Sequence, residues 1–228
     1  MKKLQLLILF SVISLGAFAQ LGTDTIKKND LTLIFTNTDA GFSKATRQRL
    51  IDAFFIVYPK EMTEYNPDAS KVVTFMIDTG YKGVAATSRN VVHYNPTWFV
   101  SHPEDIDVVT HEVMHIVQNY GRNRGTGAQR PGWLTEGIAD FVRNEYGINN
   151  EKAGWKFADF KATQSYTNAY KVTARFLYWA QKNKDPQLVK QLDAAMRNGT
   201  YTPEMWQQLT GKNVDDLWAE YAANPVIY

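Results

Sequence analysis

Short runs of β-branched and aromatic residues in the first part of the chain predict strands. Residues 31–36 and 72–77 are nearly continuous apolar runs, with the length and composition typical of buried strands. A third extended segment covers residues 90–94. Together they predict a small sheet in the N-terminal part of the chain.

Helical signals occur between these runs and dominate after them. Ser43 is a suitable N-cap for a helix that we expect to end at Pro59. From about Asp105 the pattern is helical, with starts or stops predicted at Asp185-Pro186, Asn198-Gly199, Thr202-Pro203 and Asn213. The expected class is α+β, with a small mixed sheet and helices over about 30–104 and a mainly helical half over about 105–228.

The first 19 residues have the pattern of a secretory signal peptide. Lys2 and Lys3 precede an apolar run that ends in a small-x-small cleavage pattern at Ala17 and Ala19. The apolar run is shorter than the ~20 residues of a membrane span, which disfavours the alternative of an anchor. We expect cleavage after Ala19 and a single domain over residues 20–228, located in the periplasm or outside a bacterial cell.

Charge points to no polyanionic partner. The full chain has 25 basic and 23 acidic side chains, but removing the leader takes away two lysines and no acid. The mature chain is therefore electrically balanced, which argues against nucleic-acid binding and stable membrane association. It has no cysteine, so no disulfide framework is available. We expect a monomer that relies on its core and on a metal.

The strongest chemical signal is His111-Glu112-Val-Met-His115, near the start of the helical half. On a helix, His111 and His115 project ~40° apart, so both can reach one metal ion. The apolar residues of this segment fall on the opposite side, which disfavours the alternative of two core histidines. Glu112 lies at the edge of the histidine face, where it can address a water on the metal without binding the metal itself.

A catalytic zinc site needs a third protein ligand. A metzincin would have Gly at position 118 and His at 121, but the chain has Gln118 and Gly121, so that class is excluded. The remaining histidines, His93 and His102, precede the helix and are expected to be ordinary surface or core residues.

A second predicted helix supplies a better candidate. Glu136 and Asp140 are four residues apart and share a face opposite an apolar stripe. We expect Glu136 to be the third ligand and Asp140 to accept a hydrogen bond from a metal-binding histidine. Gly137 would let the two helices approach closely. An exposed acidic face is the alternative, and the His-Glu-x-x-His motif 21 residues earlier makes the metal interpretation the better one.

The combination resembles gluzincin metallopeptidases and, more specifically, the basic secretory protein family of plant and bacterial peptidases. The resemblance covers roughly residues 30–222, and its segments are residues 111–118, 133–143, 170–177 and 209–218. It implies a zincin-like fold, one catalytic Zn²⁺ held by His111, His115 and Glu136, and Glu112 as the catalytic acid. The mature chain is not basic, so the family name does not describe its charge.

The expected reaction is peptide-bond hydrolysis by a zinc-bound water from which Glu112 takes a proton. Such peptidases often add a Tyr or His that stabilises the oxyanion. Tyr170, at the start of a predicted helix, is the candidate; Tyr166 and Arg175 are rivals, and a packing role for Tyr170 is equally open.

The zincin resemblance also implies that an extended peptide adds to a sheet edge above the metal, and residues 84–94 are expected to supply that edge. The nearby aromatics, which are core residues more often than subsites, are Tyr81, Tyr94, Trp98 and Phe99. The leading hypothesis is an exported zinc peptidase acting on peptides or proteins. The alternatives are a zinc hydrolase of cell-wall peptide crosslinks and a catalytically silent zinc-containing binding protein.

Overall fold

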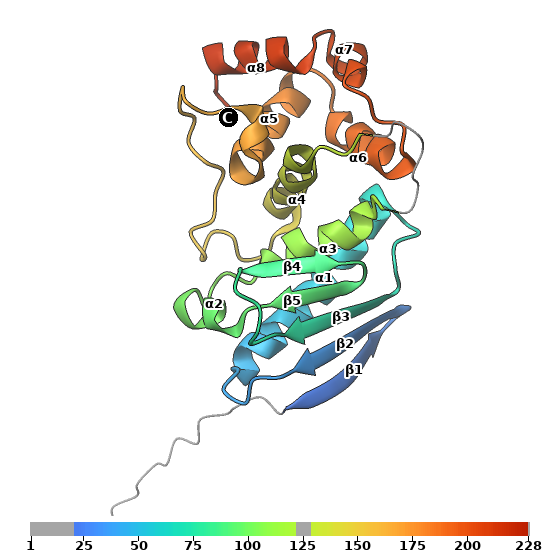
Figure 1. Cartoon of the computed structure of the whole chain (residues 1–228), viewed down its shortest axis with the longest axis vertical. Coiled ribbons are helices and arrows are strands. Elements are labelled where there is room, and N and C mark those ends of the chain that lie inside the picture. The colour runs from blue at the N-terminus through green and yellow to red at the C-terminus, as the bar shows by residue number, and fades with distance from the viewer. Residues whose placement is uncertain (1–20, 122–128, 228) are drawn as a thin grey trace, which may run out of the picture.

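A computed structural model describes residues 21–121 and 129–227. In these residues five strands form one mixed sheet in the order β1-β2-β3-β5-β4 (Figure 1). The strands are β1 (Gly22–Lys28), β2 (Leu31–Asn37), β3 (Val72–Ile77), β4 (Ala85–Ser88) and β5 (Val91–Tyr94). The central pairs β2/β3 and β3/β5 are parallel, and the outer pairs β1/β2 and β4/β5 are antiparallel. The predicted signal peptide lies outside the described residues and stays a prediction.

The sheet is buried on one face. Leu33 and Phe35 of β2 are buried, whereas their neighbours Thr32 and Ile34 are partly exposed, and β3 and β5 alternate in the same way. The three strands predicted at residues 31–36, 72–77 and 90–94 are confirmed. Only one face of each strand is buried in the core. Strand β1 was not predicted, because its Thr- and Lys-containing sequence is largely exposed. It forms a strand through its antiparallel pairing with β2.

Helix α1 (Lys44–Tyr65) lies behind the strands in Figure 1. It begins as expected, with the Ser43 hydroxyl accepting a hydrogen bond from the backbone N–H of Thr46. The expectation that Pro59 ends the helix is wrong, because α1 continues for a further turn and a half. An internal proline costs about 3 kcal/mol. Burial of Met62 and Tyr65 beyond it, at roughly 1.5–3 kcal/mol for a large apolar side chain, offsets that cost.

The rest of the chain is mainly helical. The elements are α2 (Pro96–Ser101), α3 (Val108–Gln118), α4 (Gly132–Tyr146), the 3₁₀ turn η1 (Tyr166–Asn168), α5 (Tyr170–Asn183), α6 (Leu188–Asn198), α7 (Glu204–Thr210) and α8 (Val214–Ala223). Gly199 ends α6 with a φ of 72°, and the Asn213 side chain caps α8, both as predicted. Pro186 and Pro203 were expected to be the first residues of helices, but α6 begins two residues after Pro186 and α7 begins one residue after Pro203. The α+β class is confirmed.

Packing between the elements positions α3 at the centre of the molecule. Helix α3 contacts α1 and β4 of the sheet half as well as α4 of the helical half. The buried apolar residues of the described chain form one cluster that joins both halves. No helix among the described residues is long and apolar enough to span a membrane.

Gly137 permits a close approach of helices, but not the one expected. A Cβ at this position would collide with Cγ2 of Thr173, which belongs to α5 rather than to α3. The glycine therefore lets α4 pack tightly on α5, the helix that begins with Tyr170.

Candidate active site

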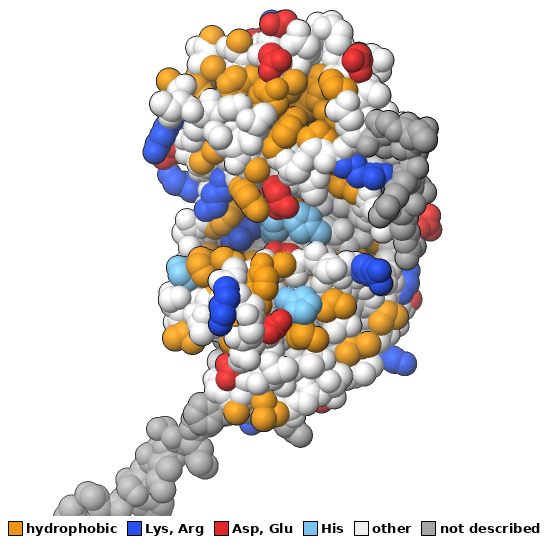
Figure 2. Space-filling view, viewed as in Figure 1, with side chains coloured by type: hydrophobic (Ala, Val, Ile, Leu, Met, Phe, Trp, Pro, Cys, Tyr) orange, Lys and Arg blue, Asp and Glu red, His pale blue; other side chains and the backbone are white. Residues whose placement is uncertain are grey.

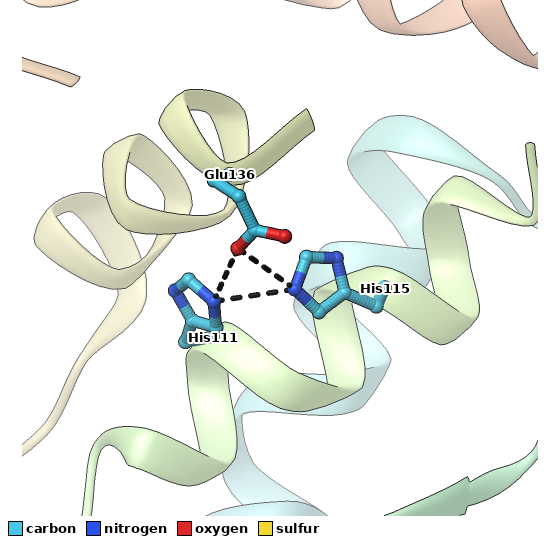
Figure 3. A group of neighbouring side chains, drawn as sticks. All are labelled: His111, His115 and Glu136. Carbon is cyan, nitrogen blue, oxygen red and sulfur yellow. Dashed lines mark hydrogen bonds and ion pairs between the residues drawn. The ribbon is translucent and has the colours of Figure 1, made fainter. Parts of the chain in front are cut away.

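His111 and His115 of α3 point towards Glu136 of α4 (Figure 3). The two Nε2 atoms are 3.2 Å apart. Oε2 of Glu136 lies 3.2 Å from Nε2 of His111 and 3.4 Å from Nε2 of His115. Residues predicted from two separate motifs thus meet at one point.

The other ring nitrogen of each histidine has its own acceptor. Nδ1 of His111 donates to Oδ1 of Asp140 at 2.7 Å, the contact predicted for this carboxylate. Nδ1 of His115 donates to Oε1 of Gln118 at 2.7 Å, and Nε2 of Gln118 donates to the carbonyl of Thr135, which fixes the amide orientation. These partners place the Nε2 lone pair of both histidines towards Glu136.

The three converging atoms fit a divalent metal ion. Two imidazole lone pairs and a carboxylate oxygen repel one another unless positive charge lies between them. Ligands at ~2.0–2.1 Å from a tetrahedral ion are about 3.3–3.4 Å apart, which matches the observed separations. A single proton bridges only two of the three atoms, whereas an ion contacts all of them. Among the described residues, this is the group of histidines and carboxylates that can hold a metal.

The pKa values of His111 and Glu136 in the metal-free protein also indicate that the cluster favours a positive charge. Burial works to lower the pKa of His111, but the hydrogen bonds to Asp140 and Glu136 outweigh it and raise that pKa to about 10. Burial works in turn to raise the pKa of Glu136, and the hydrogen bonds from both histidines lower it below its ordinary value. Without an ion, a proton on His111 partly compensates the cluster, and a metal would displace it.

Glu112 lies next to this cluster and lines the same cavity as His111 and His115. It is 5% exposed, and its Oε2 accepts a hydrogen bond of 2.7 Å from the Thr87 hydroxyl of β4. Thr87 was not among the site residues expected from the sequence, because only the folding of β4 against α3 brings it to Glu112. Gln118 carried a usable signal, since it lies three residues after His115 on the same helix.

A simple amphipathic pattern would place the histidine side of α3 in solvent. In the structure this side is buried. Nearly every residue of α3 is buried, because the sheet half covers one side and α4 covers the other. His111 is 8% exposed, but its buried partners are Asp140 and Glu136 rather than apolar side chains. The arrangement is therefore a buried polar site, not a pair of core histidines.

Tyr170 lies over the cluster. Its ring stacks on that of His111 with centroids 6.0 Å apart and an interplanar angle of 18°, and its side chain borders the cavity. Burial, followed by the charges of Glu136 and Asp140, raises the pKa of Tyr170, so the hydroxyl keeps its proton at neutral pH.

The backbone at this point is strained. Ala169 has φ 62° and ψ −175°, a region that is essentially restricted to glycine, and Tyr170 has φ 48°. Such conformations cost about 1–3 kcal/mol each and persist where the surroundings enforce them. Here the Thr173 hydroxyl donates to the carbonyl of Tyr166 and holds the preceding turn against α5.

The rivals of Tyr170 lie elsewhere. The Tyr166 hydroxyl donates to Asp215 at 2.8 Å, and Arg175 donates to the Tyr221 hydroxyl and to the Pro225 carbonyl. Neither residue borders the cavity. The remaining histidines are also engaged away from the cluster: His93 pairs with Asp78, and His102 stacks on Trp98.

The cavity that holds these groups has a volume of about 890 Å³. It is the hollow between the sheet half and the helical half in Figure 2, with histidine side chains at its floor. Residues 83–87, which include the first three residues of the edge strand β4, form one border, so the segment expected to supply a sheet edge does lie beside the cluster. Tyr81 and Trp98 line the cavity, whereas Tyr94 and Phe99 are buried in the core.

Comparisons with known proteins identify the family of this chain through one family model. No curated protein matches the chain. A crystal structure of a two-domain M1 zinc metallopeptidase mutant bound to L-tryptophan is similar at 14% identity and a TM-score of 0.43, over 88% of this chain. The chain spans about half, 47%, of the length of that protein. The family model of BSP, described as a peptidase of plants and bacteria, matches residues 34–221, a range that includes both histidines, Glu112 and Glu136. The chain therefore belongs to the BSP family of plant and bacterial peptidases.

Proposed function

We propose that this protein is a zinc-dependent peptidase whose ion is held by His111, His115 and Glu136. The observation that carries the proposal is the convergence of three lone-pair atoms at 3.2–3.4 Å beside a buried carboxylate, within a cavity bordered by an open strand edge. Three protein ligands leave a coordination position for chemistry, as catalytic zinc sites do. Zn²⁺ bound there would act as a Lewis acid that eases deprotonation of water and polarises the scissile carbonyl.

Glu112 is the proposed general base and acid. Its carboxylate takes a proton from the water that attacks the carbonyl carbon, and it passes that proton to the departing amine as the C–N bond breaks. The products are a carboxylate and an amine. Thr87 donates to one oxygen of Glu112, which orients the carboxylate and leaves its other oxygen available for the proton.

Tyr170 is the proposed donor to the oxyanion. Its protonated hydroxyl and its place over His111 support this role, since a preorganised donor at the cavity is what stabilises charge that develops on the substrate oxygen. The enforced backbone at Ala169 and Tyr170 is consistent with a side chain held in position for function.

The substrate backbone is proposed to lie along β4. Among the described residues this strand is the last in the sheet order, and it borders the cavity, so an extended peptide can add to its outer edge by main-chain hydrogen bonds. Such binding is independent of side chains and suits a peptide or protein substrate.

Export and a single mature domain belong to the same proposal. The leader pattern of residues 1–19 supports a periplasmic or secreted protein, and the continuous core cluster supports one domain after cleavage.

The direct test is hydrolysis by purified residues 20–228 loaded with zinc. We expect cleavage of a denatured protein and of peptide libraries, detected by mass spectrometry of the products. Purified peptidoglycan is the parallel substrate: cleavage of its peptide crosslinks alone would replace the proposal with a cell-wall hydrolase. Stoichiometric zinc without hydrolysis of any of these substrates would overturn the enzymatic function and favour a binding protein.

A further inference from the structure

One end of the cavity is basic. Arg143, Trp155 and Lys171, here called the basic end, line the same cavity as the histidines and Glu112. Figure 2 shows several Lys and Arg side chains gathered to the left of the histidines in the hollow. Neither the family match nor the proposed hydrolysis accounts for these residues.

Arg143 is a fixed part of the structure. Its guanidinium donates to Oδ1 of Asp105 at 2.5 Å and to Oδ1 of Asn150 at 3.0 Å, and it lies 4.7 Å from the centroid of the Trp155 ring. The side chain is almost fully buried, and Asp105 compensates its charge. Arg143 therefore holds the indole ring in place without offering a free charge.

Lys171 differs from Arg143 in having no direct ion-pair partner among the described residues. Its Nζ lies 5.2 Å from the centroid of the same Trp155 ring, and no carboxylate of the described residues forms an ion pair with it. Burial and the charge of Arg143 lower its pKa, while the charges of Asp140 and Asp105 act in the opposite direction. Asp105 is paired with Arg143, and Asp140 is hydrogen-bonded to His111. The half-buried ammonium of Lys171 is therefore left without a direct partner and can bind an anion.

The basic end lies within reach of the reacting centre. Lys171 follows Tyr170, whose ring stacks on His111. A single face of α4 carries Glu136, Asp140 and Arg143. Arg143 is seven positions after Glu136, which corresponds to about 10 Å along the helix axis. An extended peptide covers that length in roughly three residues. A group bound at the basic end would therefore belong to a residue close to the cleaved bond.

The cavity does not close at this point. A neighbouring hollow of about 360 Å³ shares Trp98, Asp105, Trp155 and Lys171 with it. A peptide can thus either end at the basic end or continue past it.

We propose that Lys171 binds a carboxylate of the substrate, within about three residues of the cleaved bond, while Trp155 and Arg143 position its ammonium. This inference rests on the proposed peptidase function and names its substrate class: peptides with an acidic side chain, or with a free C-terminal carboxylate, at that distance from the cleaved bond.

The test compares Lys171→Met with Lys182→Met. Lys182 is a matched control because it is on the same helix and lies over the Tyr178 ring at 5.3 Å, but outside the cavity. Peptide pairs that differ by Glu against Gln at each position, and by a free against an amidated C-terminus, separate the two sources of the carboxylate. We expect the wild type and Lys182→Met to favour one carboxylate member by about tenfold in kcat/KM, and Lys171→Met to lose that preference. In Lys171→Met the loss of kcat/KM should be larger on the carboxylate member of each pair than on its neutral counterpart.

Binding of the same peptides to zinc-loaded Glu112→Gln protein, followed by calorimetry, makes the test independent of turnover. The carboxylate preference in affinity should disappear in a Glu112→Gln, Lys171→Met double variant, and Lys171→Glu should reverse it towards lysine-containing peptides. If peptides bind with this preference but are not cleaved, the proposed peptidase function fails while the role of Lys171 stands. Equal affinity for charged and neutral members in the wild type, or an equal loss on both members in Lys171→Met, would overturn the role of Lys171.

Discussion

The two walls of the cavity hold their chemistry in different ways. On the α3 wall each reactive group has a fixed partner: Asp140 for His111, Gln118 for His115 and Thr87 for Glu112. On the α5 wall, Tyr170 is 53% exposed, and Lys171 lies over an indole ring without an ion-pair partner among the described residues. The α5 wall is held in place through its backbone and its packing on α4 rather than through bonds to these side chains.

This difference separates two kinds of expected effect. Groups on the α3 wall are preorganised for one task, so their loss should abolish chemistry with every substrate. Groups on the α5 wall are free to meet the substrate, so their loss should give graded effects that depend on what is bound. The following predictions test this division, from the largest effect to the smallest.

Glu112→Gln should have the largest effect. The amide cannot accept the proton of the attacking water, so we expect kcat to fall by about a thousandfold or more, with zinc content unchanged. Glu145→Gln, at an exposed position of α4, is the control and should keep full activity. Full activity of Glu112→Gln, or loss of its zinc, would show that the carboxylate has a different role.

Tyr170→Phe tests the α5 wall. Removing the hydroxyl should lower kcat by about a hundredfold while zinc and substrate affinity stay near the wild-type values, since the donor acts on charge that develops in the transition state. Tyr178→Phe, on the same helix but outside the cavity, should leave kcat unchanged. An unchanged kcat in Tyr170→Phe would leave this residue with a packing role only.

Thr87→Val probes the support of Glu112. Loss of the hydroxyl should reduce kcat by about tenfold, because the carboxylate is no longer held in one orientation, with KM and zinc content unaffected. Thr87→Ser keeps the donor and should restore most of the activity. If Thr87→Ser is as impaired as Thr87→Val, the hydroxyl is not the relevant feature.

The smallest effect concerns stability beneath the α3 wall. Glu61 of α1 is fully buried, and neither of its carboxylate oxygens has a hydrogen-bond partner among the described residues. Burial raises its pKa well above the ordinary value. In the unfolded chain the group ionises near pH ~4.3, so above that pH the folded state retains a proton that the unfolded state loses. Folding stability contributed by this group therefore falls as pH rises, by up to about 1.4 kcal/mol per pH unit until the folded pKa is reached.

Glu61→Gln removes this ionisation at nearly constant shape. We expect the variant to be more stable than the wild type at pH 8 and to lose most of that advantage at pH 4, as measured by urea unfolding at both values. An advantage that is constant with pH, or larger at pH 4, would contradict the assignment of Glu61 as a neutral buried acid.

Local patterns were sufficient to predict the parts of the site that lie on single helices. The spacing of His111 and His115, and of Glu136 and Asp140, fixes which side chains share a helix face, and the structure brings the two pairs together as expected. Strands β2, β3 and β5 were also predictable, because short runs of apolar and β-branched residues are a local signal as well.

Features that depend on tertiary packing were not predictable. Thr87 reaches Glu112 only because β4 forms the edge of the sheet beside α3, and the passage of α1 through Pro59 depends on burial of the residues that follow it. The proposed role of Lys171 depends on its position beside Trp155 and Arg143, which belong to other segments of the chain. Such contacts leave no periodic signal in the sequence.

The central claim is that His111, His115 and Glu136 hold one catalytic zinc ion. Zinc content and peptidase activity of the purified mature protein, measured together before chelation, after chelation and after readdition of zinc, test it most directly. We predict about one equivalent of zinc per chain, joint loss of metal and activity on chelation, and recovery of both with zinc. Less than about half an equivalent after careful purification, or activity that survives complete removal of the metal, would contradict the claim.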